Sequence, residues 1–64
     1  MKIKIERPKE EKELFFEGKA EKLLHQLEIN PEEVIVVKNG EIITLDEQLK
    51  DTDNIEILSV VSGG

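Results

Sequence analysis

The stretch VIVVKNGEIIT, residues 34–44, predicts a β-hairpin near the middle of the chain. Residues 34–38 are rich in β-branched side chains, which favour strands. Asn39-Gly40 is the strongest short hairpin signal, because both central positions of the favoured two-residue turn require positive φ. Residues 41–44 are then the returning strand.

A further strand is predicted at residues 55–61, after a polar turn at residues 51–54. Side chains alternate between the two faces of a strand, so Ile55 and Ile57 share one face. Glu56 marks the other face, which also carries Leu58 and Val60, as solvent-exposed. Leu45 and Leu49, in the segment between the hairpin and this strand, are expected to tuck under the edge of the sheet.

Leu58 and Val60 would belong to an exposed apolar patch if Val34 or Val36 lies beside them. Contiguous exposed apolar patches mark partner surfaces. The alternative is that the neighbouring helix or strand edge covers these side chains. Leu58, Val60 and Val36 are therefore candidates for a partner surface.

Towards the N-terminus, residues 19–27 predict a short helix. Its apolar side chains recur at positions i, i+3, i+4 and i+7 and form one stripe: Ala20, Leu23, Leu24 and Leu27. A helix this short is unstable alone, so it must lie across a sheet. His25 falls off the stripe, and no second histidine or cysteine completes a metal or catalytic pair, so it is expected to be a solvated residue.

Residues 1–5 alternate apolar and charged side chains, as a half-buried strand does. Pro8 suits a turn, and residues 11–17 are expected to return as a second strand. The arrangement that buries all apolar faces is an α+β fold of the β-grasp type. It has a mixed four- to five-stranded sheet, one crossing helix and the last strand in the centre beside the first. Residues 1–60 are expected to form this single domain, and residues 61–64 a flexible tail.

Composition excludes several classes of function. The 64 residues carry 15 acidic and 9 basic side chains, a formal charge of −6 that disfavours direct binding of nucleic acid. No apolar run approaches the length of a membrane span, and no signal peptide is visible, which favours a cytoplasmic protein without membrane contact. The chain has no cysteine, no cofactor motif and too little length to enclose a cleft, so we expect it not to be an enzyme.

The chain ends in Val61, Ser62, Gly63 and Gly64. One interpretation is a frayed end or a remnant of cloning. The chemical interpretation is that two residues without Cβ can thread a channel too narrow for a side chain, which would bring the carboxylate of Gly64 to an enzyme. A carboxylate is a poor acyl donor until it is activated, typically as an acyl-adenylate. The protein would then supply a substrate end rather than an active site.

Residues 30–64 resemble the C-terminal half of the ThiS/MoaD sulfur carriers and the small archaeal ubiquitin-like modifiers. The matching features are the Asn-Pro-Glu-Glu connector, the valine strand, Asn39-Gly40-Glu41, a leucine before an acidic turn, the Ile-Glu-Ile strand and the Val-Ser-Gly-Gly end. The first half agrees in the order of its elements. The end matches neither the Ala-Gly-Gly of thiazole carriers nor the aromatic or proline-rich run that precedes the glycines of molybdopterin carriers.

The resemblance implies that an adenylyltransferase related to the ubiquitin-activating enzymes uses ATP and Mg to adenylate Gly64, while this chain binds no cofactor itself. Gly63, Ser62 and Val61 would thread into that enzyme. A thiocarboxylate at Gly64 would donate sulfur to an accepting enzyme for thiamin, molybdopterin or tRNA thiolation. An acyl group would instead join a lysine of a target protein through an isopeptide bond. The alternative is a non-covalent β-grasp interaction domain with an incidental Gly-Gly end.

Overall fold

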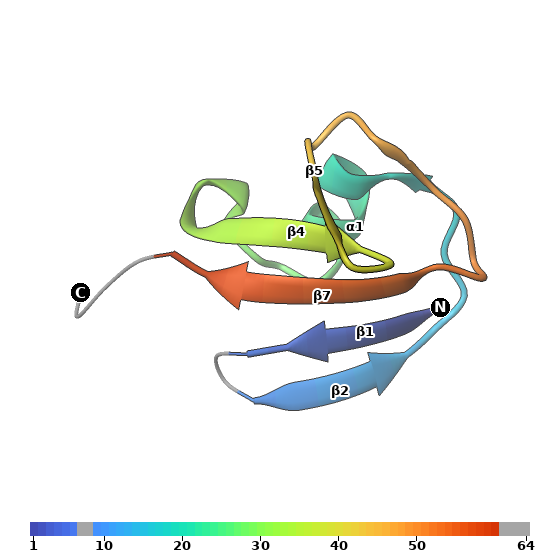
Figure 1. Ribbon diagram of the computed structural model, residues 1–64, viewed down its shortest axis with the longest axis horizontal. Helices are drawn as coiled ribbons and strands as arrows, with labels where there is room; N and C mark the ends of the chain where they lie inside the picture. The colour runs from blue at the N-terminus through green and yellow to red at the C-terminus, as the bar shows by residue number, and fades with distance from the viewer. Residues whose placement is uncertain (7–8, 61–64) are drawn as a thin grey trace.

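In the computed structural model, which describes residues 1–6 and 9–60, one helix lies against one face of a twisted sheet (Figure 1). The elements in chain order are β1 (Lys2–Ile5), β2 (Glu10–Glu13), β3 (Gly18–Lys19), α1 (Ala20–Gln26), the 3₁₀ helix η1 (Pro31–Glu33), β4 (Val34–Lys38), β5 (Glu41–Ile43), β6 (Gln48–Leu49) and β7 (Asn54–Ser59). None of the described helices is long and apolar enough to cross a membrane.

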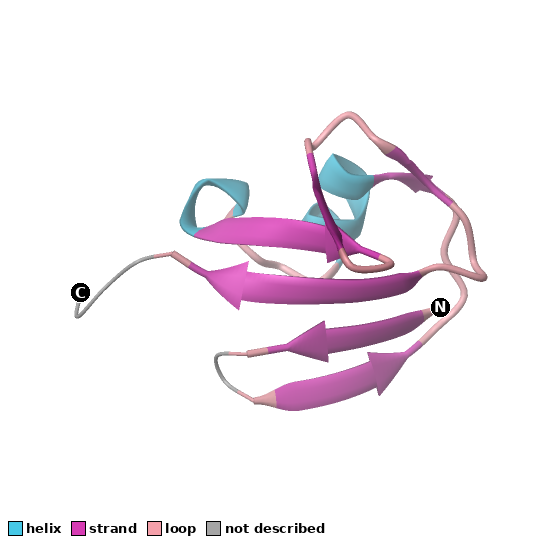
Figure 2. Ribbon diagram, in the orientation of Figure 1, coloured by secondary structure: helices cyan, strands magenta, loops and turns pink. Residues whose placement is uncertain are grey.

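The topology is that of a β-grasp. Within the described ranges, five strands form one sheet in the order β2-β1-β7-β4-β5, and β3 and β6 form a separate two-stranded sheet (Figure 2). The last strand lies in the centre, parallel to β1 and antiparallel to β4. The prediction of a mixed sheet with first and last strands side by side is confirmed. The predicted hairpin joins β4 to β5, and its turn residues Asn39 and Gly40 have φ of 50° and 87°, both positive as expected.

The core lies between α1 and the sheet. Alternation along β1 and β7 turns Ile3, Ile5, Ile55 and Ile57 towards the helix, and all four are buried. From the helix stripe, Ala20, Leu23 and Leu24 are completely buried, and Leu27 packs partly buried against the same cluster. Leu49 is also completely buried and Leu45 packs against the cluster, so both leucines lie under the sheet as predicted.

Two predicted strands differ from the structure by more than one residue at an end. The last strand, predicted at residues 55–61, covers Asn54–Ser59, and Val61 lies outside the described residues. The second strand, predicted at residues 11–17, covers only Glu10–Glu13. Leu14 is still hydrogen-bonded to Met1. Beyond Leu14 the side chain of Phe16 is buried in the core, while Phe15 stays 76% exposed.

The ammonium group of Met1 is a buried structural element. It donates to the carbonyl oxygen of Leu14 at 2.8 Å and to Oδ1 of Asp51 at 2.9 Å. The same Oδ1 accepts the N–H of Phe16 at 3.1 Å. Asp51 therefore ties the start of β1 to the segment that follows β2. These contacts, the ammonium first, lower the pKa of Asp51 from its usual 3.8.

This pKa shift predicts an acid-sensitive contribution to stability. Because the folded chain holds Asp51 ionised, its contribution is present above the unfolded pKa near 3.8 and is lost as pH falls through the lower folded value. We expect Asp51→Asn to lower the melting temperature at pH 7 by several degrees. The gap to wild type should close as pH falls below about 4. Thermal denaturation at pH 2–7 measures this, with the exposed residue Glu17 as the control variant Glu17→Gln. A gap that stays constant with pH would contradict the assignment.

Candidate functional site

The described chain leaves the sheet at Val60. Its N–H donates to the carbonyl oxygen of Glu33 at 2.9 Å, which extends the pairing of β7 with β4 by one residue beyond Ser59. The end of β7 and the beginning of β4 lie at the same end of the molecule (Figure 1). The four candidate tail residues, Val61, Ser62, Gly63 and Gly64, lie outside the described residues. The structure therefore fixes the exit point, Val60, from which they continue.

The exit point adjoins the face of the five-stranded sheet opposite α1, here called the open face. Alternation along β7 places Leu58 and Val60 on this face, with Leu58 half-buried and Val60 48% exposed. The cross-strand partner of Leu58 is Ile35 in β4. In the described part of the chain neither the helix nor a strand edge covers Val60. The prediction that this side chain is exposed is therefore confirmed, and the alternative that it is covered is not.

Val36 does not belong to this surface, and its prediction as a partner residue was wrong. It pairs with Ile57 in β7 and Ile43 in β5, on the face that packs against the helix, and its side chain is only 2% exposed. The physical reason is the period of two along a strand. A register that differs by one residue moves every side chain to the other face. Val34 likewise packs partly buried against the core.

Sequence reasoning missed the residues that do continue the surface. Ile35 pairs with Leu58, Val37 lies two positions along β4 on the same face, and Val37 pairs with Ile42 in β5. Ile42 is 72% exposed. Together, Leu58, Val60, Ile35, Val37 and Ile42 form what we call the apolar patch, in which Val37 joins Ile35 to Ile42 but is itself only 9% exposed. The hairpin turn could have revealed the pair of Val37 and Ile42, because a two-residue turn fixes the register of its strands.

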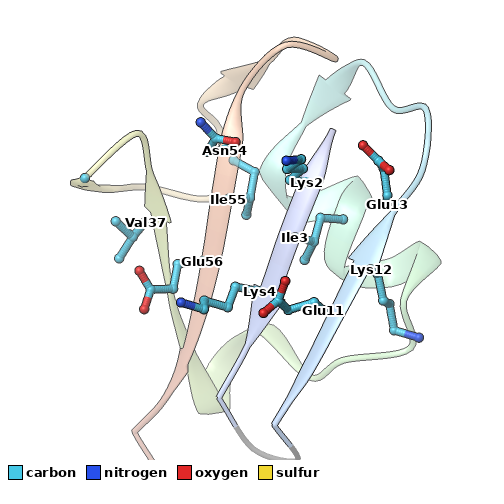
Figure 3. A pocket seen from close by; sticks show the side chains of 11 residues that line it. Lys2, Ile3, Lys4, Glu11, Lys12, Glu13, Val37, Asn54, Ile55 and Glu56 are labelled. Atoms are coloured by element: carbon cyan, nitrogen blue, oxygen red, sulfur yellow. The ribbon is translucent and has the colours of Figure 1, made fainter.

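The other half of the open face is charged. One cross-strand row runs from Glu11 in β2 through Lys4 in β1 and Glu56 in β7 to Val37. Figure 3 shows Lys4 between Glu56 and Glu11 in this row, which borders a shallow hollow of about 390 Å³. The open face therefore combines an apolar half on β4, β5 and the end of β7 with a half of alternating charge on β1 and β2. Such a division orients a partner as well as binding it.

Lys38, the last residue of β4, forms an ion pair with Glu47. Its Nζ donates to Oε2 of Glu47 at 2.9 Å. This hydrogen bond is the main reason that the pKa of Lys38 is raised above its usual value.

His25 is exposed on α1, as predicted. Among the residues that the structure describes, no group of three or more histidine, cysteine or acidic side chains could hold a metal ion. The exit point and the apolar patch therefore remain the candidate functional features of the described chain.

Comparison with known proteins agrees with the geometry. The model of the ThiS family matches residues 4–64, which includes the four tail residues. A curated relative, the sulfur carrier protein TtuB of Thermus thermophilus, is 40% identical over 42 residues. The match covers 66% of this chain and 65% of that relative, so the chain spans just under two thirds of the relative's length.

Proposed function

Because this chain belongs to the ThiS family, we propose that it is a sulfur carrier whose working atom is the carboxyl carbon of Gly64. The match of the family model through residue 64 is the observation that carries the proposal. The name of the relative, a sulfur carrier protein, supports it. The β-grasp domain then serves to present the C-terminus to a partner enzyme.

The proposed chemistry begins with activation. The Gly64 carboxylate attacks the α-phosphate of ATP, pyrophosphate leaves, and an acyl-adenylate forms on an adenylyltransferase that binds ATP and Mg. Adenylation converts a poor acyl donor into one with a good leaving group. The outer sulfur of a persulfide on the partner's side then attacks the carbonyl carbon, AMP leaves and an acyl disulfide forms. A second thiol of the partner attacks the donor sulfur and breaks the S–S bond, which leaves a thiocarboxylate at Gly64 and a disulfide on the partner. The sulfur-accepting enzyme takes its sulfur from this group.

The short tail constrains how the partner must bind. Four residues beyond Val60 span at most about 14 Å when fully extended. An enzyme that holds Gly64 in its active site therefore also touches the surface around the exit point. The apolar patch adjoins that point and is exposed at Val60 and Ile42. We propose that the activating enzyme docks on the apolar patch while Val61, Ser62 and Gly63 thread towards its nucleotide.

Glycine at the last two positions fits this role, because an enzyme channel that admits only backbone excludes any Cβ. The same activated carbonyl can be attacked by a lysine amine of a target protein, which would give an isopeptide bond instead of a thiocarboxylate. The two outcomes differ only in the nucleophile that receives the acyl group.

The intact mass of the protein, purified from its native cells without reductant or C-terminal tag, tests the proposal. Replacement of one terminal oxygen by sulfur makes the chain about 16 Da heavier, and we expect this species. Larger adducts in which Gly64 is joined to lysine would identify a protein modifier. An unmodified mass with no adducts would contradict both and favour a non-covalent interaction domain.

A further inference from the structure

A second concave surface lies at the same end of the molecule, on the helix side of the sheet. It is a hollow of about 340 Å³ with an apolar floor. The floor is formed by Ile5, Ile57, Val34, Leu27 and Ile29. The first two are buried and the other three pack partly buried against the core. Ser59, the last residue of β7, also lines it, so the hollow reaches to one residue before the exit point.

Acidic side chains from three separate elements line the rim of this hollow. Glu10 comes from β2, Glu28 follows α1, and Glu33 ends η1. Among the described residues that line the hollow, Lys12 is the basic one, so their three carboxylates and one ammonium sum to a charge of −2. Nζ of Lys12 lies 3.8 Å from Oε2 of Glu10, which is beyond direct hydrogen-bond distance. Oε2 of Glu33 accepts a hydrogen bond from Nδ2 of Asn30 at 2.9 Å, and Asn30 also lines the hollow. The rim therefore keeps a net negative charge above an apolar floor, and Glu28 is the carboxylate for which the described residues show no ion pair or side-chain hydrogen bond.

Glu28 occupies a backbone position that favours glycine. The helix ends in a Schellman arrangement, in which Glu28 N–H donates to the carbonyl oxygen of His25 at 3.1 Å and Ile29 N–H donates to that of Leu24 at 2.9 Å. Glu28 itself has φ of 60°, the left-handed region in which glycine is the usual residue at this point. The chain thus carries a carboxylate at the rim where glycine would fit the backbone with less strain.

We infer that this hollow binds an arginine side chain of a partner protein. Arginine has an apolar stem that lies along apolar surface while its charged head stays at the edge. Its guanidinium group carries five N–H donors in a planar fork, which suits carboxylates that approach from several directions. The formal charge of −6 attracts basic partners to the chain as a whole. The apolar floor and acidic rim match the two parts of this one side chain.

The position of the hollow suggests which partner supplies the arginine. The tail spans at most about 14 Å, so a protein that holds Gly64 also approaches the helix side of the exit point. Only this identification of the partner rests on the proposed function. Binding of arginine is a property of the folded chain alone and is tested without any enzyme. If the chain does not bind arginine, the expected thiocarboxylate mass at Gly64 still stands. If the thiocarboxylate mass is not found, the arginine site still stands.

The test is an NMR titration of the ¹⁵N-labelled protein with the peptide acetyl-Gly-Arg-Gly-amide. Its matched control is the same peptide with citrulline, which keeps the shape of arginine and removes the charge. We expect saturable shifts of the backbone amides of Leu27, Ile29 and Val34, and binding of the citrulline peptide weaker by about tenfold. Equal binding of both peptides, or shifts confined to the open face, would overturn the inference.

Glu28→Gly separates binding from folding. It removes one rim carboxylate while relieving the left-handed strain, so we expect a higher melting temperature together with weaker binding of the arginine peptide. Glu21→Gln, in the helix that precedes Glu28 but absent from the lining of the hollow, should bind the peptide as wild type does. A Glu28→Gly variant that binds the peptide with unchanged affinity would refute the role of the rim.

Discussion

Removal of Gly63 and Gly64 is expected to abolish ATP-dependent adenylation of the protein while leaving its melting temperature unchanged. The strands and core described for residues 1–6 and 9–60 are held together by contacts among themselves. Truncation leaves two residues beyond Val60, which shortens the maximum reach from about 14 Å to about 7 Å. The new terminal carboxylate, on Ser62, would also carry a side chain where the proposed channel admits only backbone.

Adenylation is measured as pyrophosphate released by the cognate activating enzyme, and the expected loss is at least about 100-fold, because the reacting atom can no longer be positioned. Ser62→Ala is the matched control, since it alters the tail but keeps both glycines and the full reach. It should be activated at nearly the wild-type rate. Normal activation of the truncated chain would remove Gly64 from the mechanism.

The second large effect is expected from two neighbouring residues on opposite faces of β7. Leu58→Glu places a charge in the apolar patch, next to the exit point. We expect the apparent affinity for the activating enzyme to fall by at least about tenfold, because central apolar contacts of an interface contribute about 2 kcal/mol or more when they are hot spots. The melting temperature should change little, since Leu58 lies outside the buried core.

Ile57→Ala should show the opposite pattern. Ile57 is 1% exposed in the central strand, and truncation of a buried isoleucine costs about 2–5 kcal/mol. A domain of this size has a total stability of only about 3–10 kcal/mol, so a large part of it would be lost. Urea denaturation measures the stability, and adenylation per folded molecule should stay near wild type. If Leu58→Glu stays folded and is activated normally, the docking surface lies elsewhere.

These expectations differ in how far sequence patterns support them. The helix stripe, the Asn39-Gly40 turn and the alternation along residues 55–59 are local patterns, and each is confirmed by the structure. The end of β2 was misjudged because Phe15 and Phe16 read as strand residues by propensity. In the structure, Phe16 instead fills a gap in the core, which is a tertiary demand that overrides a local preference.

The residues of the candidate site also divide into those that a local sequence pattern predicts and those that only the tertiary structure places. Leu58 and Val60 could be assigned to an exposed face from Glu56 alone. Their neighbours could not be assigned, because the register of β4 against β7 joins residues more than 15 positions apart. That register selects Ile35 and Val37 over Val36. The rim carboxylates of the helix-side hollow come from three separate elements, and no spacing in the sequence predicts that they lie close together.

The main strands, the helix, the β-grasp order and the diglycine end can be read from the amino-acid order, because they depend on side-chain periodicity, turn chemistry and composition within short windows. The short elements η1, β3 and β6 were not predicted. Only the tertiary structure shows which residues share a face of the sheet. It also shows that Val36 is buried, that Ile42 is exposed and that the Met1 ammonium donates a hydrogen bond to Asp51. The physical reason is that long-range register and packing minimise the free energy of the whole chain, where a shift of one residue exchanges the buried and exposed faces.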